Sequence, residues 1–436
     1  MRRELRQADM HIPINKSTIG EEERSAAKAV IDSDALTMGA QCRAFEREFA
    51  GYLGVEHAVM VNSGSSANLI ALFAMSDALV PNDDTLPRRI MPGSEVIVPA
   101  LTWSTTIWPV LQAGAKPVFV DCDPYSLQMT PEAIEAAITP NTSAIIVVHV
   151  LGGAVDVAAV EAIARRRKLW LFEDTCEALG VAWNGKNVGS FGHLASFSFY
   201  FSHHITTIEG GMVVTNDARM ADLLRAIRAH GWVRDMHARK EVEAGYPHID
   251  PRFLFLTTGF NVRPTEINGA IGLQQLKKLP AFNESRRAIA RRLDAGLDAL
   301  DQAGKLTLIR HHPRVTPAPF GYTVLCGSRD MRDGLRDHLE AAGVETRPVI
   351  CGNLTRQPAL AHHSYRINGE LSGADRVMDC GLYWGTHPFD RGRRGLHRRD
   401  GQAVLLTNGS GRAAAPAWLR PRRSRPAPLR AMLALA

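Results

Sequence analysis

A series of short, continuous apolar segments constrains the fold of this chain more than any other feature of the sequence. Four such segments, rich in valine, isoleucine, leucine and phenylalanine, occupy residues 95–99, 117–121, 144–149 and 169–174. Continuous apolar strands that alternate with helices are typical of a parallel sheet covered on both faces. We therefore expect an α/β fold with a mainly parallel central sheet. Functional side chains should lie beyond the carboxyl ends of its strands, which is where Trp103 and Asp174 stand in the sequence.

Small polar residues at positions 62–68 run directly into an apolar stretch at 69–74, as Asn-Ser-Gly-Ser-Ser-Ala-Asn followed by Leu-Ile-Ala-Leu-Phe-Ala. This pattern is typical of a turn that enters a helix, where backbone N–H groups and the helix dipole favour a dianion. Gly64 and Ser65 are therefore candidates for binding a phosphate group. Taken alone, such a turn is more often only a helix N-cap.

The second half of the sequence indicates a long helix and then a smaller unit. Residues 264–300 have helical character, and we expect Pro280 to interrupt that helix because proline lacks the N–H group that a helix needs. Strand-like and helical segments follow between residues 305 and 389, which predicts a small α/β domain.

These patterns divide the chain into three parts. We expect an N-terminal arm and a large domain over residues 1–270, and a connecting helix with a small C-terminal domain over 271–389. The rest, residues 390–436, is rich in arginine, proline and alanine. Such a composition cannot bury a core and predicts disorder. We interpret this tail as an out-of-frame translation, with a genuine basic extension as the alternative.

The net charge of +6 comes from the same tail, which holds eleven arginines and two aspartates, so that residues 1–389 carry a charge of −3. A mildly acidic body gives no support for a nucleic-acid-binding face. The six cysteines form no Cys-x-x-Cys or Cys-x-Cys pair, which indicates reduced and mostly buried thiols. No apolar stretch has the length of a signal peptide core or a membrane span. We expect a cytoplasmic protein that does not bind nucleic acid or membranes.

Residues 196–211 carry the most specific motif, Ser-Phe-Ser-Phe-Tyr-Phe-Ser-His-His-Ile-Thr-Thr-Ile-Glu-Gly-Gly. It resembles the cofactor-lysine motif of the DegT/StrS family of sugar aminotransferases, which depend on pyridoxal 5′-phosphate (PLP). In that motif a lysine stands six residues before Glu-Gly-Gly, and here that position holds His203. The resemblance covers about residues 10–389 and implies the fold-type I architecture, which is like that of aspartate aminotransferase.

The lysine of the family forms a Schiff base with PLP and also moves protons, because a desolvated amine is both a nucleophile and a base. Histidine cannot form that bond, but its imidazole can take and return a proton near neutral pH. The resemblance therefore implies an enzyme that uses PLP and its amine form, pyridoxamine 5′-phosphate (PMP), without a covalent anchor. His203 would be its base and acid. That His203 and His204 merely cap a strand is the weaker alternative, given the flanking motif.

The resemblance also assigns residues to the PLP ring. Asp174 would pair with the ring nitrogen and keep it protonated, so that the ring accepts electrons. Glu177 stands where aminotransferases carry glutamine beside the phenolic oxygen, and a carboxylate there would have to share a proton with that oxygen. Trp103 would stack on the ring, with ordinary core packing as the alternative.

The phosphate group of PLP would be bound by Gly64, Ser65 and Ser198. The family completes this site with an asparagine of the second subunit, for which Asn261 is the candidate. A site shared in this way implies a two-fold symmetric homodimer.

His230, Arg234 and Arg263 are weaker candidates for the substrate side, because basic groups suit a nucleotide diphosphate. Ordinary surface roles are the alternative. The histidine replacement is known in branches of the family that remove the C3 hydroxyl of nucleotide-linked 4-keto-6-deoxyhexoses, with L-glutamate as the amino donor. These enzymes serve dideoxysugar and lipopolysaccharide O-antigen biosynthesis.

One branch acts on GDP-4-keto-6-deoxymannose. Another acts on CDP-4-keto-6-deoxyglucose and carries an iron–sulfur cluster on closely spaced cysteines. No cysteine lies between Cys176 and Cys326, so we favour the GDP-sugar branch and expect neither a cluster nor another metal. The alternatives are a CDP-sugar dehydrase, an aminotransferase-like protein and a non-catalytic PLP-binding sensor.

Overall fold

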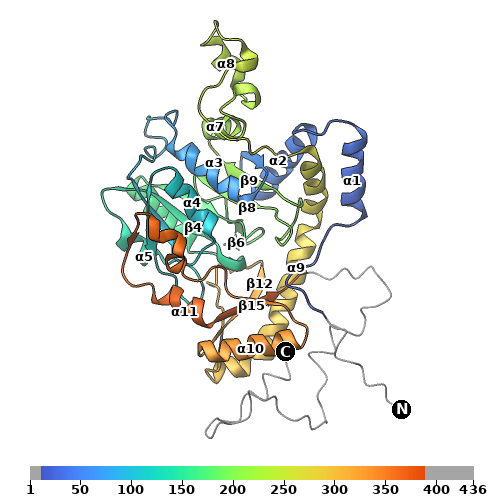
Figure 1. Ribbon diagram of the computed structural model, residues 1–436, viewed down its shortest axis with the longest axis vertical. Coiled ribbons are helices and arrows are strands. Elements are labelled where there is room, and N and C mark those ends of the chain that lie inside the picture. Colours follow the sequence, from blue (N-terminus) through green and yellow to red (C-terminus); the bar gives the residue numbers. More distant parts are fainter. Residues whose placement is uncertain (1–10, 388–436) are drawn as a thin grey trace.

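The computed structural model describes residues 11–387 (Figure 1). The predictions for the tail at 390–436 lie outside the described residues. Within them, no helix is both long enough and apolar enough to cross a membrane.

A mixed sheet of eight strands forms the centre of the structure. In spatial order its strands are β1 (His57–Val61), β9 (Gly211–Thr215), β8 (Leu194–Ser198), β5 (Trp170–Asp174), β4 (Thr142–Val148), β2 (Glu95–Pro99), β3 (Lys116–Val120) and β14 (Arg366–Ile367). β9 is antiparallel to its two neighbours, and the other pairs are parallel. The four segments that the sequence predicts as strands correspond to β2, β3, β4 and β5. The expected α/β fold with a mainly parallel sheet is confirmed.

Helices cover both faces of this sheet because successive strand residues point to opposite sides. In β2, for example, Val96 and Val98 belong to the apolar core on one face, and Ile97 belongs to the core on the other. The first face is covered by α3 (Gly64–Ser76), α4 (Ser104–Gln112) and α7 (Ala218–Arg228). The second face is covered by α2 (Ala40–Leu53), α5 (Pro131–Ala137), α6 (Val157–Arg167) and the first part of α9 (Glu266–Gln302).

The long helix α9 runs from the large sheet to a second, smaller sheet (Figure 1). The expected interruption at Pro280 is wrong, because α9 continues through that residue. A proline within a helix removes one hydrogen bond and crowds the preceding turn. Here the helix packs against α1 (Glu21–Asp32) and α2 before the proline and against the small sheet after it, and we attribute its continuity to this packing on both sides.

The small sheet is antiparallel, in the order β10 (Leu306–Leu308), β12 (Gly321–Cys326), β15 (Gly381–Gly385) and β13 (Thr346–Arg347). It packs with α10 (Arg329–Ala341) and α11 (Ser372–Cys380), so the predicted small α/β unit is present. The proposed boundary between residues 270 and 271 falls inside α9, which belongs to both parts.

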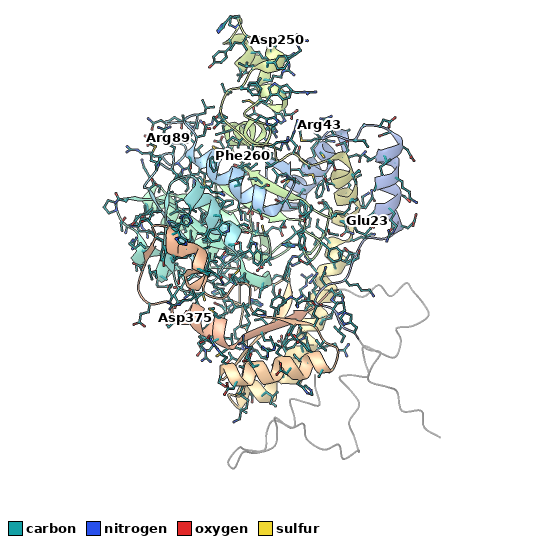
Figure 2. All side chains as sticks on the ribbon, in the orientation of Figure 1. Glu23, Arg43, Arg89, Asp250, Phe260 and Asp375 are labelled. Atoms are coloured by element: carbon teal, nitrogen blue, oxygen red, sulfur yellow. The ribbon has the colours of Figure 1, made fainter. Side chains whose placement is uncertain are left out.

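Several smaller features lie outside the two main sheets. A three-stranded sheet consists of β11 (Val315–Thr316), β6 (Ala182–Trp183) and β7 (Lys186–Asn187). A projection carries α8 (Arg239–Ala244) away from the body, and Asp250 lies near its tip (Figure 2). Short 3₁₀ helices occupy Val150–Gly152, Val233–Asp235, Pro251–Phe253, Leu354–Arg356 and Pro358–His362.

Candidate active site

Asp174 is the last residue of β5, at the carboxyl edge of the sheet, and it is almost fully buried. Its Oδ2 accepts hydrogen bonds from Asn68 Nδ2 at 2.9 Å and from Thr106 Oγ1 at 2.8 Å. Its Oδ1 accepts a longer bond from the Cys176 N–H, at 3.2 Å. Two side chains thus fix one carboxylate oxygen, and the other retains capacity for a further donor.

The two donors to Asp174 belong to a larger polar network. Thr102 Oγ1 donates to Thr106 Oγ1 at 2.9 Å, and Ser196 Oγ donates to Asn68 Oδ1 at 2.5 Å. Thr102, Thr106, Asn68 and Ser196 are all buried. Since satisfied buried networks are rigid, Asp174 is held in one orientation between α3, α4 and β8.

Gly64 and Ser198 meet where α3 begins. A Cβ atom on Gly64 would lie 2.5 Å from Ser198 Cβ and 2.9 Å from Ser198 Oγ, so only glycine allows this approach. Ser63 caps the helix by accepting the N–H of Ser66 at 3.1 Å. The N–H groups of Gly64 and Ser65 belong to the first turn, where N–H groups have no partner within the helix. The Ser198 hydroxyl and the N-terminus of α3 therefore lie close together, which is a favourable arrangement for a phosphate group.

Trp103 is the N-cap residue of α4, beyond the end of β2, and 56% of its surface is exposed. So large an exposed area on an indole is unusual for a residue of the core. Thr102, the neighbour of Trp103, joins the network that holds Asp174. Its large exposed ring is available to stack on a ligand, and the role of Trp103 as the stacking residue stays a prediction.

The two adjacent histidines have different surroundings. His204 is buried, and its Nε2–H donates a hydrogen bond of 2.8 Å to the carbonyl oxygen of Ala318. His203 is partly accessible, and its buried Nδ1 has no hydrogen-bond partner within residues 11–387. Burial lowers the pKa of His203 to about 3, and the positive charge of Arg286 adds to this effect. His203 is therefore neutral at physiological pH and has a ring nitrogen to offer.

Glu177 lies close to Asp174, and its Oε2 accepts the N–H of Leu151 at 3.0 Å. Burial raises the pKa of Glu177 to about 7, an effect that the Leu151 N–H opposes and the charge of Asp174 increases. Part of the residue remains accessible, although protein atoms enclose its carboxyl group. Near neutral pH this carboxyl group can therefore hold or release a proton.

The structure does not join the remaining predicted residues to this group. Asn261 is exposed and its Oδ1 accepts a bond of 3.1 Å from Arg263 Nε. His230 is exposed at the end of α7, with a φ of 66°. Arg234 lies over the ring of Trp232, 5.1 Å from its centroid. These residues remain predictions. The stretch that holds Asn261 and Arg263 runs beside the turn that leads into α3, where the Asn62 N–H donates to the Val262 carbonyl oxygen at 3.0 Å.

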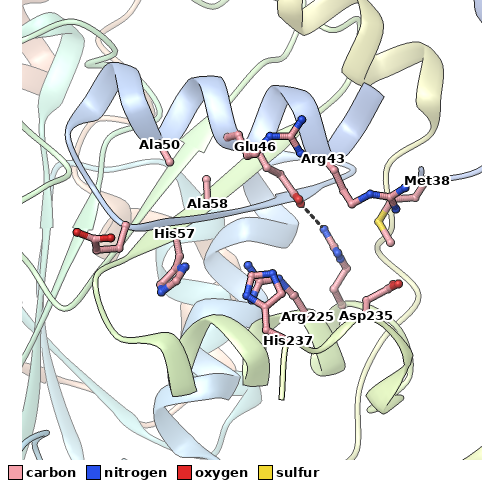
Figure 3. Close-up of a pocket in the computed structure, with 12 residues that line it drawn as sticks. Met38, Arg43, Glu46, Ala50, His57, Ala58, Arg225, Asp235 and His237 are labelled. Atoms are coloured by element: carbon pink, nitrogen blue, oxygen red, sulfur yellow. Dashed lines mark hydrogen bonds and ion pairs between the residues drawn. The ribbon is translucent and has the colours of Figure 1, made fainter. Parts of the chain in front are cut away.

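A hollow of about 240 Å³ elsewhere in the large domain does not compete as an active site (Figure 3). Its buried charges are already paired, since Arg228 binds Glu46 Oε1 at 2.7 Å and Arg225 binds Asp222 at 2.8 Å. An ion pair that is satisfied internally serves the fold and leaves little for a ligand.

Sequence reasoning missed four residues of the site. Asn68 was detectable as a polar residue on an otherwise apolar helix, and Thr106 lies three residues after Trp103. Phe320 packs edge-on against His203, and Arg286 is a buried neighbour of both histidines. No local motif marks these last two, since they come from distant parts of the chain.

The group of residues fits the expected PLP cofactor. The first turn of α3 and the Ser198 hydroxyl suit its phosphate group, Asp174 Oδ1 suits its protonated ring nitrogen, and the accessible part of the His203 ring can face its reacting carbon. These residues would hold it without a covalent bond.

Comparison with known proteins identifies the family of this chain. A family model described as the DegT/DnrJ/EryC1/StrS aminotransferase family matches residues 17–388. The GDP-4-keto-6-deoxy-D-mannose 3-dehydratase of Yersinia pseudotuberculosis is 37% identical over 398 residues, which cover 88% of this chain and 96% of that protein. The dTDP-4-dehydro-2,6-dideoxy-D-glucose 3-dehydratase of Saccharopolyspora spinosa is 35% identical over 390 residues, which cover 86% and 83% of the two chains.

Among solved structures, a GDP-4-keto-6-deoxymannose-3-dehydratase with a trapped PLP-glutamate geminal diamine superimposes with a TM-score of 0.79 at 34% identity. The match covers 86% of this chain and 96% of that one. The expected fold of PLP-dependent aminotransferases is thereby confirmed.

Proposed function

Because this chain belongs to the DegT/DnrJ/EryC1/StrS aminotransferase family, we propose that it removes the C3 hydroxyl of a GDP-linked 4-keto-6-deoxyhexose. GDP-4-keto-6-deoxymannose is the proposed substrate, L-glutamate the amino donor and PLP the cofactor. The observation that carries the proposal is the neutral, partly accessible imidazole of His203 at the position of the Schiff-base lysine. The relatives named above act as 3-dehydratases of nucleotide sugars, which supports the same reading.

When bound, PLP supplies an electron sink and, after amination by glutamate, an amine that joins the 4-keto carbon of the sugar. The accessible side of the His203 imidazole would take the proton that the cofactor-bound substrate loses, and would return it to the departing C3 hydroxyl, which leaves as water. A histidine that is neutral before the reaction is in the correct state for the first of these transfers. Water then releases ammonia and the 3-deoxy sugar.

The other residues of the site bind the cofactor and fix its orientation. Asp174 Oδ1 retains the proton on the ring nitrogen, while Asn68 and Thr106 fix the orientation of the carboxylate. Gly64, Ser65 and Ser198 bind the phosphate group. This binding has to retain the cofactor by itself, because His203 forms no bond to it.

Glu177 has a different task from that of the usual glutamine. Its raised pKa makes the protonated carboxyl available near neutral pH, so it can donate a hydrogen bond to the phenolic oxygen or accept one from it. Leu151 holds the other side of the carboxyl group through its N–H.

The nucleotide and the assembly are the finer parts of the proposal. The GDP-linked relative and the scattered cysteines favour GDP over CDP. A homodimer would bring the partner subunit's Asn261 to the phosphate site, and the exposed, basic environment of Asn261 and Arg263 suits such a contact. His230, Arg234 and Arg263 are proposed to bind the nucleotide diphosphate.

Ammonia release tests the proposed reaction. Full-length protein with PLP and glutamate should release ammonia with GDP-4-keto-6-deoxymannose and much less with CDP-4-keto-6-deoxyglucose. The variant His203→Asn should lose at least a hundredfold in rate, as expected for loss of a general base. Cofactor binding without turnover of either sugar would instead indicate a sensor, and an unchanged rate in His203→Asn would remove histidine from the mechanism.

Complementation tests the shared site. Variants His203→Asn and Asn261→Ala should each be inactive alone, but mixed dimers of the two should regain activity, because one of their two sites then has both residues intact. Failure of the mixture, in a preparation shown by light scattering to be dimeric and exchanged, would place both residues in the same subunit's site.

A further inference from the structure

One short segment contacts His203 directly and is connected to Glu177 through Leu151, and these are the two residues that distinguish this site from that of an aminotransferase. We propose that residues 318–320, which we call the strap, position His203 and Glu177 together, with Phe320 and Arg286 as the positioning residues. The inference rests on the proposed function, because it explains what holds His203 and Glu177 in the positions that the proposed reaction needs.

The strap reaches Glu177 through one residue, Leu151. The Leu151 N–H donates to Glu177 Oε2 at 3.0 Å, while its carbonyl oxygen accepts the N–H of Phe320 at 3.2 Å. A second backbone bond, from the Ala318 N–H to the Gly152 carbonyl oxygen at 3.0 Å, fixes the strap beside the loop that follows β4. A shift of Phe320 would therefore change the donor that orients Glu177.

The contact between strap and loop has little room to adjust. Leu151 has a φ of 48°, which is uncommon for a residue other than glycine. Gly152 has a φ of 86°, and a Cβ atom there would lie 2.0 Å from the Ala318 carbonyl oxygen. A backbone conformation of this kind persists only where the surrounding structure holds it in place. A displacement of the strap would therefore move this loop as well.

The strap reaches the histidines through its other side. The ring of Phe320 packs edge-on against His203, with 5.1 Å between centroids and 80° between planes, and against His204 at 5.6 Å and 63°. His204 Nε2 also donates to the Ala318 carbonyl oxygen at 2.8 Å. His204 is thereby fixed to the strap backbone, and His203 rests on the Phe320 ring with Nδ1 left unpaired.

Arg286 of α9 anchors the strap from the opposite side. Its guanidinium donates to the carbonyl oxygens of Pro319 at 3.3 Å and Phe320 at 3.0 Å, and to Thr386 Oγ1 at 3.3 Å. Arg286 is 2% exposed, and no ion pair is recorded for it within residues 11–387. A buried cation close to the histidines also disfavours a proton on His203. The same side chain therefore fixes the strap and helps to keep His203 neutral.

The variant Phe320→Leu tests the strap, because it removes the ring and retains apolar volume and all backbone bonds. We expect a fall in kcat for ammonia release of roughly tenfold, with little change in KM for the sugar, since displacement of a catalytic group affects the chemical step. Phe282→Leu is the matched control. Phe282 is also partly buried, but it packs in the core between α2 and α9.

A second readout needs neither cofactor nor turnover. In full-length protein with ¹⁵N-labelled histidine, the ring nitrogen signals of His203, assigned with His203→Asn, should move in Phe320→Leu and stay in place in Phe282→Leu. Arg286→Lys keeps the charge but replaces the Nη1 donor that bonds Pro319 and Phe320 with a differently placed ammonium group, and it should move these signals in the same direction as Phe320→Leu.

If Phe320→Leu lowers thermal stability as Phe282→Leu does, but leaves kcat and the His203 signals unchanged, the strap is merely structural and the inference is wrong. Should Arg286→Lys fail to fold, Phe320→Leu decides alone. If the unaltered protein releases no ammonia, the proposed function fails, whereas movement of the His203 signals still supports the positioning role.

Discussion

Asn68 Nδ2 donates a hydrogen bond of 2.9 Å to Asp174 Oδ2, and through its own Oδ1 Asn68 accepts the hydroxyl of Ser196 at 2.5 Å. One buried amide thus connects α3, β5 and β8. Because the amide occupies Oδ2, the geometry leaves Oδ1 of Asp174 for the cofactor's ring nitrogen. The helix that contributes its first turn to the phosphate site also orients the carboxylate.

We predict that Asn68→Ala weakens PLP binding roughly tenfold, about the free energy of one hydrogen bond to a charged group. The measurement is a titration of PLP followed by its absorbance. Asn283→Ala is the control, since Asn283 is equally buried and its amide donates to the Leu179 carbonyl oxygen at 3.1 Å, away from Asp174. Equal PLP affinity in the two variants would contradict the role given to Asn68.

Gly64→Ala should reduce PLP affinity by a larger factor, about a hundredfold. The new Cβ would lie only 2.5 Å from Ser198 Cβ, so Ser198 would have to move away from the phosphate site. The double variant Gly64→Ala/Ser198→Gly removes the obstructing side chain. It should recover part of the affinity, although it lacks the Ser198 hydroxyl. If the double variant binds PLP no better than Gly64→Ala, steric conflict with Ser198 is not the cause.

The pair of changes Ser202→Asn and His203→Lys should rebuild the covalent anchor. We expect borohydride treatment to fix PLP to the protein in this variant and not in the unaltered chain, with ammonia release lost. Mass spectrometry of the reduced protein makes the comparison directly. Absence of the adduct, in protein that still binds PLP, would show that residue 203 does not reach the reacting carbon of the cofactor.

The sequence predicts the parts of this site that lie in continuous motifs. The turn at Gly64, the strand end at Asp174 and the histidine at 203 can each be read from neighbouring residues, because strand periodicity and helix caps are local properties. The apolar strands β2 to β5 follow for the same reason.

The interactions between those motifs could not be predicted in this way. Phe320 and Arg286 approach His203 only because α9 passes to the small sheet and β12 returns beside the loop after β4. Pro280 is a second example of a tertiary effect that local sequence does not reveal. Its local effect predicts a break in the helix, but packing along α9 preserves the helix. Which side of His203 remains unpaired is likewise a property of the tertiary structure.

The last prediction concerns Glu177 and pH. Burial raises the pKa of Glu177 from 4.5 to about 7, so between these values the folded protein holds a proton that the unfolded chain has lost. The stabilisation linked to this proton is therefore fully present below pH 4.5 and disappears as the pH rises through 7. For a shift of this size it amounts to about 3 kcal/mol at most.

Urea unfolding of the cofactor-free protein at pH 5, 6, 7 and 8 measures this dependence. The free energy of unfolding of the unaltered protein should fall with rising pH relative to Glu177→Gln, whose amide oxygen can still accept the Leu151 N–H. His203 and His204 have lowered pKa values and act in the opposite direction, losing stability as the pH falls. Their effect cancels in the difference, because both proteins contain them. A difference that does not change between pH 5 and 8 would mean that Glu177 is ionised throughout, and that it cannot donate a proton to the cofactor's phenolic oxygen.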